Sequence, residues 1–388
     1  MRRLRTLSTR SLVVLVATVA LLAGGGAAIA VAAGDGSGPT PPPKALPEAL
    51  HDALAASKPD GITARIKFTN NLFPSGALLG QAGSALMSGA SGRLWLTNDG
   101  RGRLELQSDA GDAQVVWNQS EVTVYDASSN TVYRAKLPAH QQTTESGGGA
   151  PPSVAEIADF LTKAGQHADV SGAQPTNVSG QPAYSVSVSP KHDGGLLGSA
   201  ELAWDAARGV PLRVGIYAQG GSSPVLQLEA TDISYGAVSD SDVNVAPPAD
   251  AKSVDLGAPS AGSGESKANP VSGLDAVQAA AGFPVVAPDT LVGLPRQDVR
   301  LVGKAVLVVY GHGLGAIVVV ERAADAAAGH NGGMLSSLPT VSLDGSTGHE
   351  LATQLGTVLG WQRNGVALVL AGSLPPAAAE TAARDLAR

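Results

Sequence analysis

Short segments in which apolar and polar residues alternate recur along the N-terminal part of the chain. They lie at 62–68, 93–97, 103–107, 114–118, 121–126 and 131–136. A period of two is typical of β-strands with one buried face. The connectors NDGRG, NQS and ASSN between them are short enough for hairpins. The pattern therefore predicts an antiparallel meander.

Two helices are predicted beside these strands. Leu46, Leu50 and Leu54 recur every four residues, which indicates a short amphipathic helix. Ser153 with Glu156 three positions later is typical of a capping box, so a helix is expected over 153–163. Alternation then resumes in further predicted strands at 183–189, 200–205, 212–218 and 224–235.

The C-terminal part has its own set of elements. Helices are predicted at 273–281 and 376–386, and strands at 299–302, 305–310, 316–321, part of 351–355 and 366–371. Alternation places Trp361, Val366, Leu368 and Leu370 in a core. We expect a small α+β domain at 273–388. The Gly-, Ser- and Pro-rich stretch before it predicts a linker at 251–272.

The N-terminus carries a targeting pattern. Arg2, Arg3, Arg5 and Arg10 precede an uncharged run at 11–33 that is long enough to span a bilayer core of about 30 Å. The pattern predicts a signal peptide or a signal anchor at 1–33, followed by a Pro- and Gly-rich spacer at 34–44. Both alternatives place the chain outside the cytoplasm, either held at the cell membrane or secreted.

Composition narrows the function classes. The chain of 388 residues has 44% hydrophobic residues, enough for two cores. Its net charge is −7 and its dense basic cluster is the N-terminal one, which argues against a nucleic-acid partner. Cysteine is absent, which excludes disulfides, thiol catalysis and a lipid-modified cysteine anchor.

Motifs for catalysis are incomplete. Gly311, Gly313 and Gly315 precede a β-branched run rather than a helix, so a hairpin turn is favoured over a phosphate loop. His349 and Glu350 begin a zinc pattern, but Thr353 stands where the second imidazole is needed. The G-x-S-x-G pattern is missing. The sequence predicts no catalytic residue, metal or cofactor, and thus no enzyme.

An apolar sheet face remains as the candidate site. It could be an ordinary core under helices, or a concave sheet over an apolar cavity, since the chain has only 4% aromatic residues to fill a wide half-barrel. The cavity candidates are Leu94, Leu96, Leu104, Leu106, Val122, Val124, Val186, Leu202, Trp204, Val214, Ile216, Leu226 and Leu228.

Two stretches carry a family resemblance. The run at 91–138, which contains VYDASSNTVY, and AELAWDAARGVPLRVGIYA at 200–218 resemble the LolA-like lipoprotein-carrier superfamily over about 45–250. The pattern WQRNGVALVLAG at 361–372 is similar to a small domain that follows LolA-like or anti-sigma regions in Gram-positive bacteria. In that superfamily an incomplete antiparallel barrel wraps helices and holds acyl chains. Its members carry lipoproteins or, in the RseB-type branch, sense them and restrain an anti-sigma factor.

The resemblance implies an α+β chain with a LolA-like half-barrel at 45–250, helices on the concave face, and a second domain. We expect an extracytoplasmic protein that binds a lipid or lipoprotein acyl chain as carrier or sensor. The alternative is an envelope-stress regulatory module that contacts a membrane protein such as an anti-sigma factor.

Overall fold

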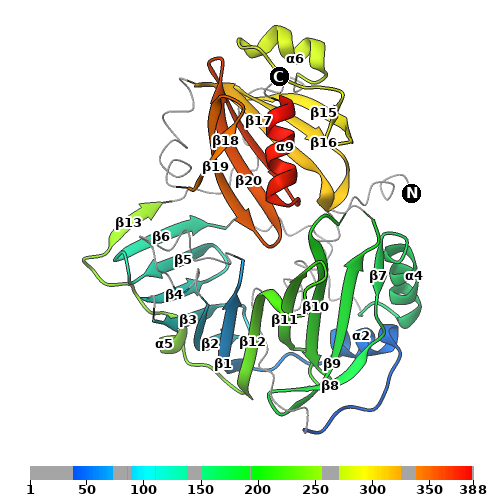
Figure 1. Ribbon diagram of the computed structural model, residues 1–388. Coiled ribbons are helices and arrows are strands. Elements are labelled where there is room, and N and C mark those ends of the chain that lie inside the picture. The colour runs from blue at the N-terminus through cyan, green and yellow to red at the C-terminus, as the bar shows by residue number, and fades with distance from the viewer. Residues whose placement is uncertain are drawn as a thin grey trace.

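Two mainly antiparallel sheets, one in each half of the chain, organise the protein (Figure 1). The computed structural model describes residues 38–72, 85, 89–109, 111–137, 151–192, 194–255, 271–324 and 338–386. The predicted leader at 1–33 lies outside these residues. Within the described parts of the chain, no helix is both long and apolar enough to cross a bilayer.

The N-terminal sheet has 13 strands. They are β1 (Gly61–Asn70), β2 (Ala90–Thr97), β3 (Gly102–Ser108), β4 (Gly111–Trp117), β5 (Glu121–Asp126), β6 (Thr131–Lys136), β7 (Ala168–Val170), β8 (Gln174–Val178), β9 (Gln181–Pro190), β10 (Leu197–Asp205), β11 (Pro211–Ala218), β12 (Pro224–Tyr235) and β13 (Lys252–Asp255). Their order is β13-β6-β5-β4-β3-β2-β1-β12-β11-β10-β9-β7, with β8 paired to β9. The meander β2 to β6 confirms the hairpins that were predicted from the short connectors.

The N-terminal sheet is curved into an open half-barrel, and helices α2 (Leu46–Ala55) and α4 (Val154–Ala164) lie at its β7–β10 end (Figure 1). Helix α2 packs its buried Leu46 and Ala49 against Tyr184 and Trp204 of β9 and β10. Helix α4 lies beside α2 and β7. It begins with the predicted capping box at Ser153. The predicted fold class, α+β with an incomplete antiparallel barrel, is confirmed.

The C-terminal sheet has 8 strands in the order β14-β15-β16-β17-β21-β20-β19-β18. They are β14 (Thr290–Leu291), β15 (Leu294–Val302), β16 (Ala305–Tyr310), β17 (Ile317–Ala323), β18 (Thr340–Leu343), β19 (Ser346–Thr353), β20 (Gly356–Arg363) and β21 (Val366–Gly372). Helix α6 (Leu274–Ala281) packs on β15 and β16. Helix α9 (Pro376–Leu386) contacts β20 and β21 and also both edge strands, β14 and β18. The sheet therefore curls around α9.

This curled sheet encloses a dense core. Val319, Leu359 and Leu370 are fully buried, in one cluster with apolar residues of α9. Trp361, Val366 and Leu368 are buried as well, which confirms that part of the predicted core. The sequence predicted a small α+β domain but not that its sheet is a second half-barrel.

Several strands were not predicted. They are β7, β8, β13, β14, β18 and β20. Among them, β13 falls inside the predicted linker at 251–272, yet it pairs in parallel with β6, with Lys252 opposite Thr131. The residues at 256–270 lie outside the described parts of the chain.

Candidate ligand-binding face

Strand register places the predicted cavity residues on one face of the N-terminal sheet. Leu94 lies opposite Leu104 in the β2–β3 pair. Val214 lies opposite Leu202 in one pair and Leu228 in the other. The same register continues through the other candidates, because paired residues in a sheet share a face. We call this the apolar face.

Charge is segregated to the opposite side, which we call the polar face. The side chains of Arg65, Arg93 and Glu105 alternate with apolar-face residues along β1, β2 and β3. Among the described residues of β1 to β6, Asp126 at the end of β5 is the single charged residue in register with the apolar face. The sheet is therefore amphipathic across its whole meander.

Helices cover one part of the apolar face. Val186 and Trp204 are buried, and with Leu202 they belong to the cluster that α2 completes. In this part of the apolar face, the side chains form an ordinary core under helices, which is the first of the two alternatives given in the sequence analysis. Leu94 and Leu106 are also buried, in the central core of the sheet.

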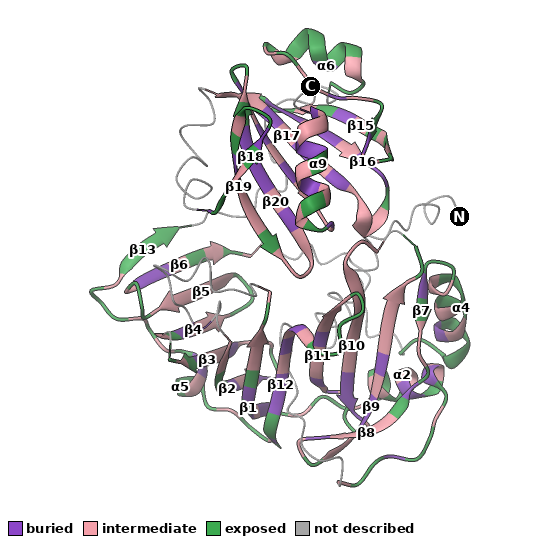
Figure 2. Cartoon of the chain, in the orientation of Figure 1, coloured by how far each residue is buried: buried purple, intermediate pink, exposed green. Residues whose placement is uncertain are grey.

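The rest of the apolar face is half-buried. The predicted residues with this exposure outside the helix-covered part are Leu96, Leu104, Val122, Val124, Val214, Ile216, Leu226 and Leu228. Figure 2 shows the corresponding intermediate exposure along β3, β5, β11 and β12. These side chains keep apolar surface in contact with water, which a ligand could cover.

Trp117 extends this surface and was missed by the sequence analysis. It lies opposite Gly102 in the β3–β4 register and opposite Val122 in the β4–β5 register. A Cβ atom at Gly102 would overlap the indole ring, so the ring lies over a position that requires glycine. The alternation of Val115 and Trp117 with Gln114 and Val116 was the available signal.

The polar face contains a buried carboxyl group. Glu229 on β12 is 2% exposed and lies between Lys67 on β1 and Arg213 on β11 in the strand register. Burial raises the pKa of Glu229 to about 8, while the charges of Arg213 and Lys67 act in the opposite direction. Arg213 also pairs with Glu201 at 3.4 Å. This cluster lies on the side of the sheet away from the apolar face.

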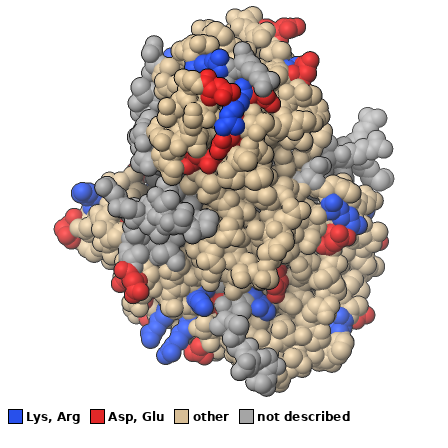
Figure 3. Space-filling model, in the orientation of Figure 1, with Lys and Arg blue, Asp and Glu red and all other residues tan. Residues whose placement is uncertain are grey.

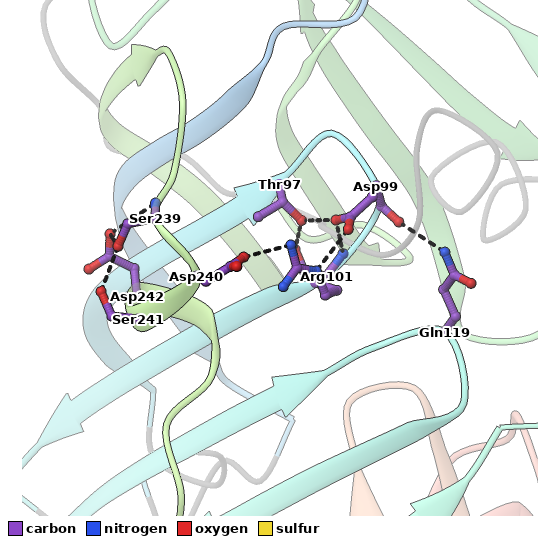
Figure 4. A network of polar contacts seen from close by, with 8 residues as sticks. All are labelled: Thr97, Asp99, Arg101, Gln119, Ser239, Asp240, Ser241 and Asp242. Atoms are coloured by element: carbon purple, nitrogen blue, oxygen red, sulfur yellow. Dashed lines mark hydrogen bonds and ion pairs between the residues drawn. The ribbon is translucent and has the colours of Figure 1, made fainter.

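A second polar network fixes the short helix α5 (Asp240–Val243) to the meander. Arg101 pairs with Asp99 and with Asp240, each at 2.8 Å (Figure 4). The hydrogen bond from Thr97 and the contacts from Arg101 lower the pKa of Asp99. Asp99 and Asp240 are exposed to solvent, and the network joins the β2–β3 turn to α5, so its role is structural.

The C-terminal core also holds a buried carboxyl group. Glu321 on β17 is fully buried, and its Oε2 accepts a hydrogen bond of 3.0 Å from the backbone N–H of Val286. Burial raises the pKa of Glu321 to about 7, against the effect of that hydrogen bond. Glu321 thereby ties the segment between α6 and β14 to the sheet.

The weak motifs have structural roles. The glycines after Tyr310 form the 3₁₀ turn Gly313–Gly315 between the antiparallel strands β16 and β17, which confirms the predicted hairpin. His349 lies on β19 with its Nδ1 at 3.3 Å from the carbonyl of Leu338. Across the described ranges, no group of three or more His, Cys, Asp or Glu side chains is placed to hold a metal ion.

No protein-family model matches the sequence, and no curated protein matches it. Among solved structures, the Pseudomonas aeruginosa MucA/MucB complex aligns with a TM-score of 0.41 at 15% identity, covering 87% of this chain and 95% of that chain. A structure of MucB in complex with MucA(peri) aligns with a TM-score of 0.40 at 16% identity, covering 87% of this chain and 94% of that chain.

A LolA-superfamily protein from Nitrosomonas europaea aligns over 52% of this chain and 98% of its own, with a TM-score of 0.23 at 10% identity.

Proposed function

We propose that this chain is a non-enzymatic, extracytoplasmic protein that binds the acyl chain of a lipid or lipoprotein on the apolar face of its N-terminal half-barrel. The observation that carries the proposal is the half-buried aliphatic surface of β3, β5, β11 and β12, which α2 and α4 leave uncovered. Groups of exposed apolar side chains on a protein surface mark interaction sites.

The chemistry of the face favours a hydrocarbon over a peptide. A peptide laid across a sheet face needs partners for its backbone N–H and C=O groups, because an unpaired buried polar group is costly. Leu104, Val115 and Val124 lie side by side in register and offer no such partner. A methylene chain needs none, and it gains about 25 cal/mol per Å² of apolar surface buried.

Affinity from buried hydrocarbon area alone makes little distinction between headgroups. We therefore expect fatty acids and phospholipids with the same chain to bind similarly. The predicted leader at 1–33 would place the apolar face outside the cytoplasm, where the chain would act as a lipid carrier or sensor at the membrane or as a secreted protein.

The test is a titration of protein purified without detergent with a fluorescent fatty acid. Val124→Glu and Leu104→Glu should each weaken binding by about tenfold or more, because a charge would replace apolar contact. Thr123→Glu is the matched control, since Thr123 is the neighbour of Val124 on the polar face. It should bind like the parent.

Absence of saturable binding by the parent would contradict the proposal. That result would favour the alternative, an envelope-stress module that acts by contact with a membrane protein such as an anti-sigma factor. Equal loss in Val124→Glu and Thr123→Glu would point to a folding defect rather than to a ligand face.

A further inference from the structure

The two half-barrels touch at one end of the N-terminal sheet. At that end β1 finishes, and the turn between β9 and β10 lies nearby. The backbone N–H of Gln354 donates to the carbonyl of Leu72 at 3.3 Å, and its side-chain Nε2 donates to the carbonyl of Asn71 at 2.6 Å. The backbone N–H of Leu196 donates to Ser373 Oγ at 2.9 Å.

The C-terminal side of this contact is a preformed unit. Ser373 Oγ donates to the carbonyl of Leu355 at 2.7 Å while it accepts from Leu196. Thr353 Oγ1 closes the same turn, with Gly356 N–H at 3.1 Å. We call residues 353–356 together with Ser373 the docking turn. The side chains of Ser373 and Gln354 therefore couple the docking turn to the N-terminal domain.

The docking turn lies at the end of the N-terminal sheet that carries the last residues of the apolar face on β11 and β12. Its attachment points, Asn71 after β1 and Leu196 before β10, flank β12 and β11 in the sheet order. The apolar residues at this end of β12 and β11 are Leu226, which is opposite Asn70, and Ile216, which is opposite Leu226. Both are half-buried members of the apolar face.

Between the described residues of the two domains, the contact is close but made of few hydrogen bonds. Gly195 has φ +57°, and a Cβ atom there would overlap Ser373, so the approach of the two domains depends on glycine. The hydrogen bonds involve no charged group, and Figure 3 shows mostly uncharged surface around the junction. Since one such bond is worth about 1 kcal/mol net, and interfaces between domains of one chain commonly open, this contact can be released.

We propose that the docking turn is a reversible latch. When it is docked on the N-terminal domain, it closes the end of the apolar face at Leu226 and Ile216. When it separates from the N-terminal domain, an acyl chain that reaches this end binds. The inference rests on the proposed function, because it needs a ligand on the apolar face. It assigns Gln354, Ser373 and Gly195 a part in controlling that ligand.

A reversible disulfide tests the latch in the full chain. Leu72→Cys with Gln354→Cys introduces two thiols into a chain without cysteine, at positions that share a backbone hydrogen bond and so lie near disulfide range. Palmitate affinity is measured for the same protein oxidised and reduced. The oxidised, latched form should bind at least about fivefold more weakly.

A pair of glycine variants gives the opposite perturbation. Gly195→Val should push the docking turn away and bind palmitate at least as tightly as the parent. Gly220→Val is the matched control, because Gly220 has φ +72° and no atom within 4 Å of its added Cβ. It carries the same kind of backbone strain without touching the docking turn, and it should bind like the parent.

The outcomes separate the two proposals. Equal palmitate affinity in the oxidised and reduced forms overturns the latch and leaves the ligand face standing. Weaker binding by Gly195→Val than by Gly220→Val also overturns the latch. Failure of every form to bind palmitate overturns both the latch and the proposed function.

Discussion

The two half-barrels of this protein use the same kind of curved antiparallel sheet in different ways. The C-terminal sheet closes on α9, which touches both of its edge strands, and fully buries residues such as Leu370. The N-terminal sheet has helices α2 and α4 against β7 to β10, while Val124 and Leu104 on the meander stay half-buried. An apolar face covered by its own helix is a core, whereas an uncovered one is a candidate binding surface.

The largest expected change in the free energy of unfolding tests this difference in packing. Leu370→Ala removes a fully buried side chain from the C-terminal core, so it should lower the free energy of unfolding of that domain by about 2–5 kcal/mol. Val124→Ala removes a half-buried side chain from the meander and should cost about 1 kcal/mol. Calorimetric unfolding of both variants measures the difference. Equal losses would show that the apolar face is packed as a core.

The second expected effect is a pH dependence of the stability of the C-terminal domain, caused by Glu321. Its carboxyl group loses its proton near pH 4.5 in the unfolded chain and near pH 7 in the folded domain. Between these values the unfolded state binds fewer protons, so the stability of the C-terminal domain should fall as the pH rises. The total fall should be about 3 kcal/mol.

Glu321→Gln should remove this pH dependence, because the amide stays neutral and its oxygen can still accept from Val286. Unfolding of both proteins at several pH values is the measurement. Parallel curves for the two proteins between pH 4.5 and 7 would contradict the assignment. Glu229→Gln is the matched control, since Glu229 belongs to the N-terminal domain and should leave the C-terminal slope unchanged.

The smallest effect concerns the helical cover of the N-terminal sheet. Ser153 Oγ accepts from the backbone N–H of Glu156 at the start of α4, and Ser153→Ala should cost about 1 kcal/mol. Amide hydrogen exchange should quicken in α4 and stay the same in α9, which belongs to the other half-barrel. Faster exchange in both α4 and α9 would show that the helices of the two half-barrels are not independent in stability.

Much of the fold was predictable because each strand of the meander is defined by residues that are neighbours in the sequence. Alternation over 103–107 and 121–126 gave the strands and the faces of Leu104 and Val124. The capping box at Ser153 gave the start of α4. In each case the residues that decide the structure are close in sequence.

Some missed strands had signals that the sequence analysis did not use. Asn364 with Gly365 joins β20 to β21, and Asp344 with Gly345 joins β18 to β19, with positive φ at all four residues. Such dipeptides between apolar runs favour two-residue hairpins. They could have revealed β18 and β20.

The extent of helical cover could not be predicted in the same way. The burial of Trp204 depends on Leu46 of α2, far away in the sequence. The contact of α9 with both β14 and β18 likewise depends on the curvature of a whole sheet. Alternation identified which residues share the apolar face, but tertiary packing decides which of them a helix covers.

The most direct test of the central claim uses two tryptophans on opposite sides of the meander. Trp117 lies on the apolar face, opposite Val122, while Trp95 lies on the polar face, opposite Arg103. A brominated fatty acid quenches tryptophans that it touches. We expect saturable quenching that is lost in Trp117→Phe and kept in Trp95→Phe. Quenching that survives in Trp117→Phe and is lost in Trp95→Phe would place the ligand on the polar face and contradict the account.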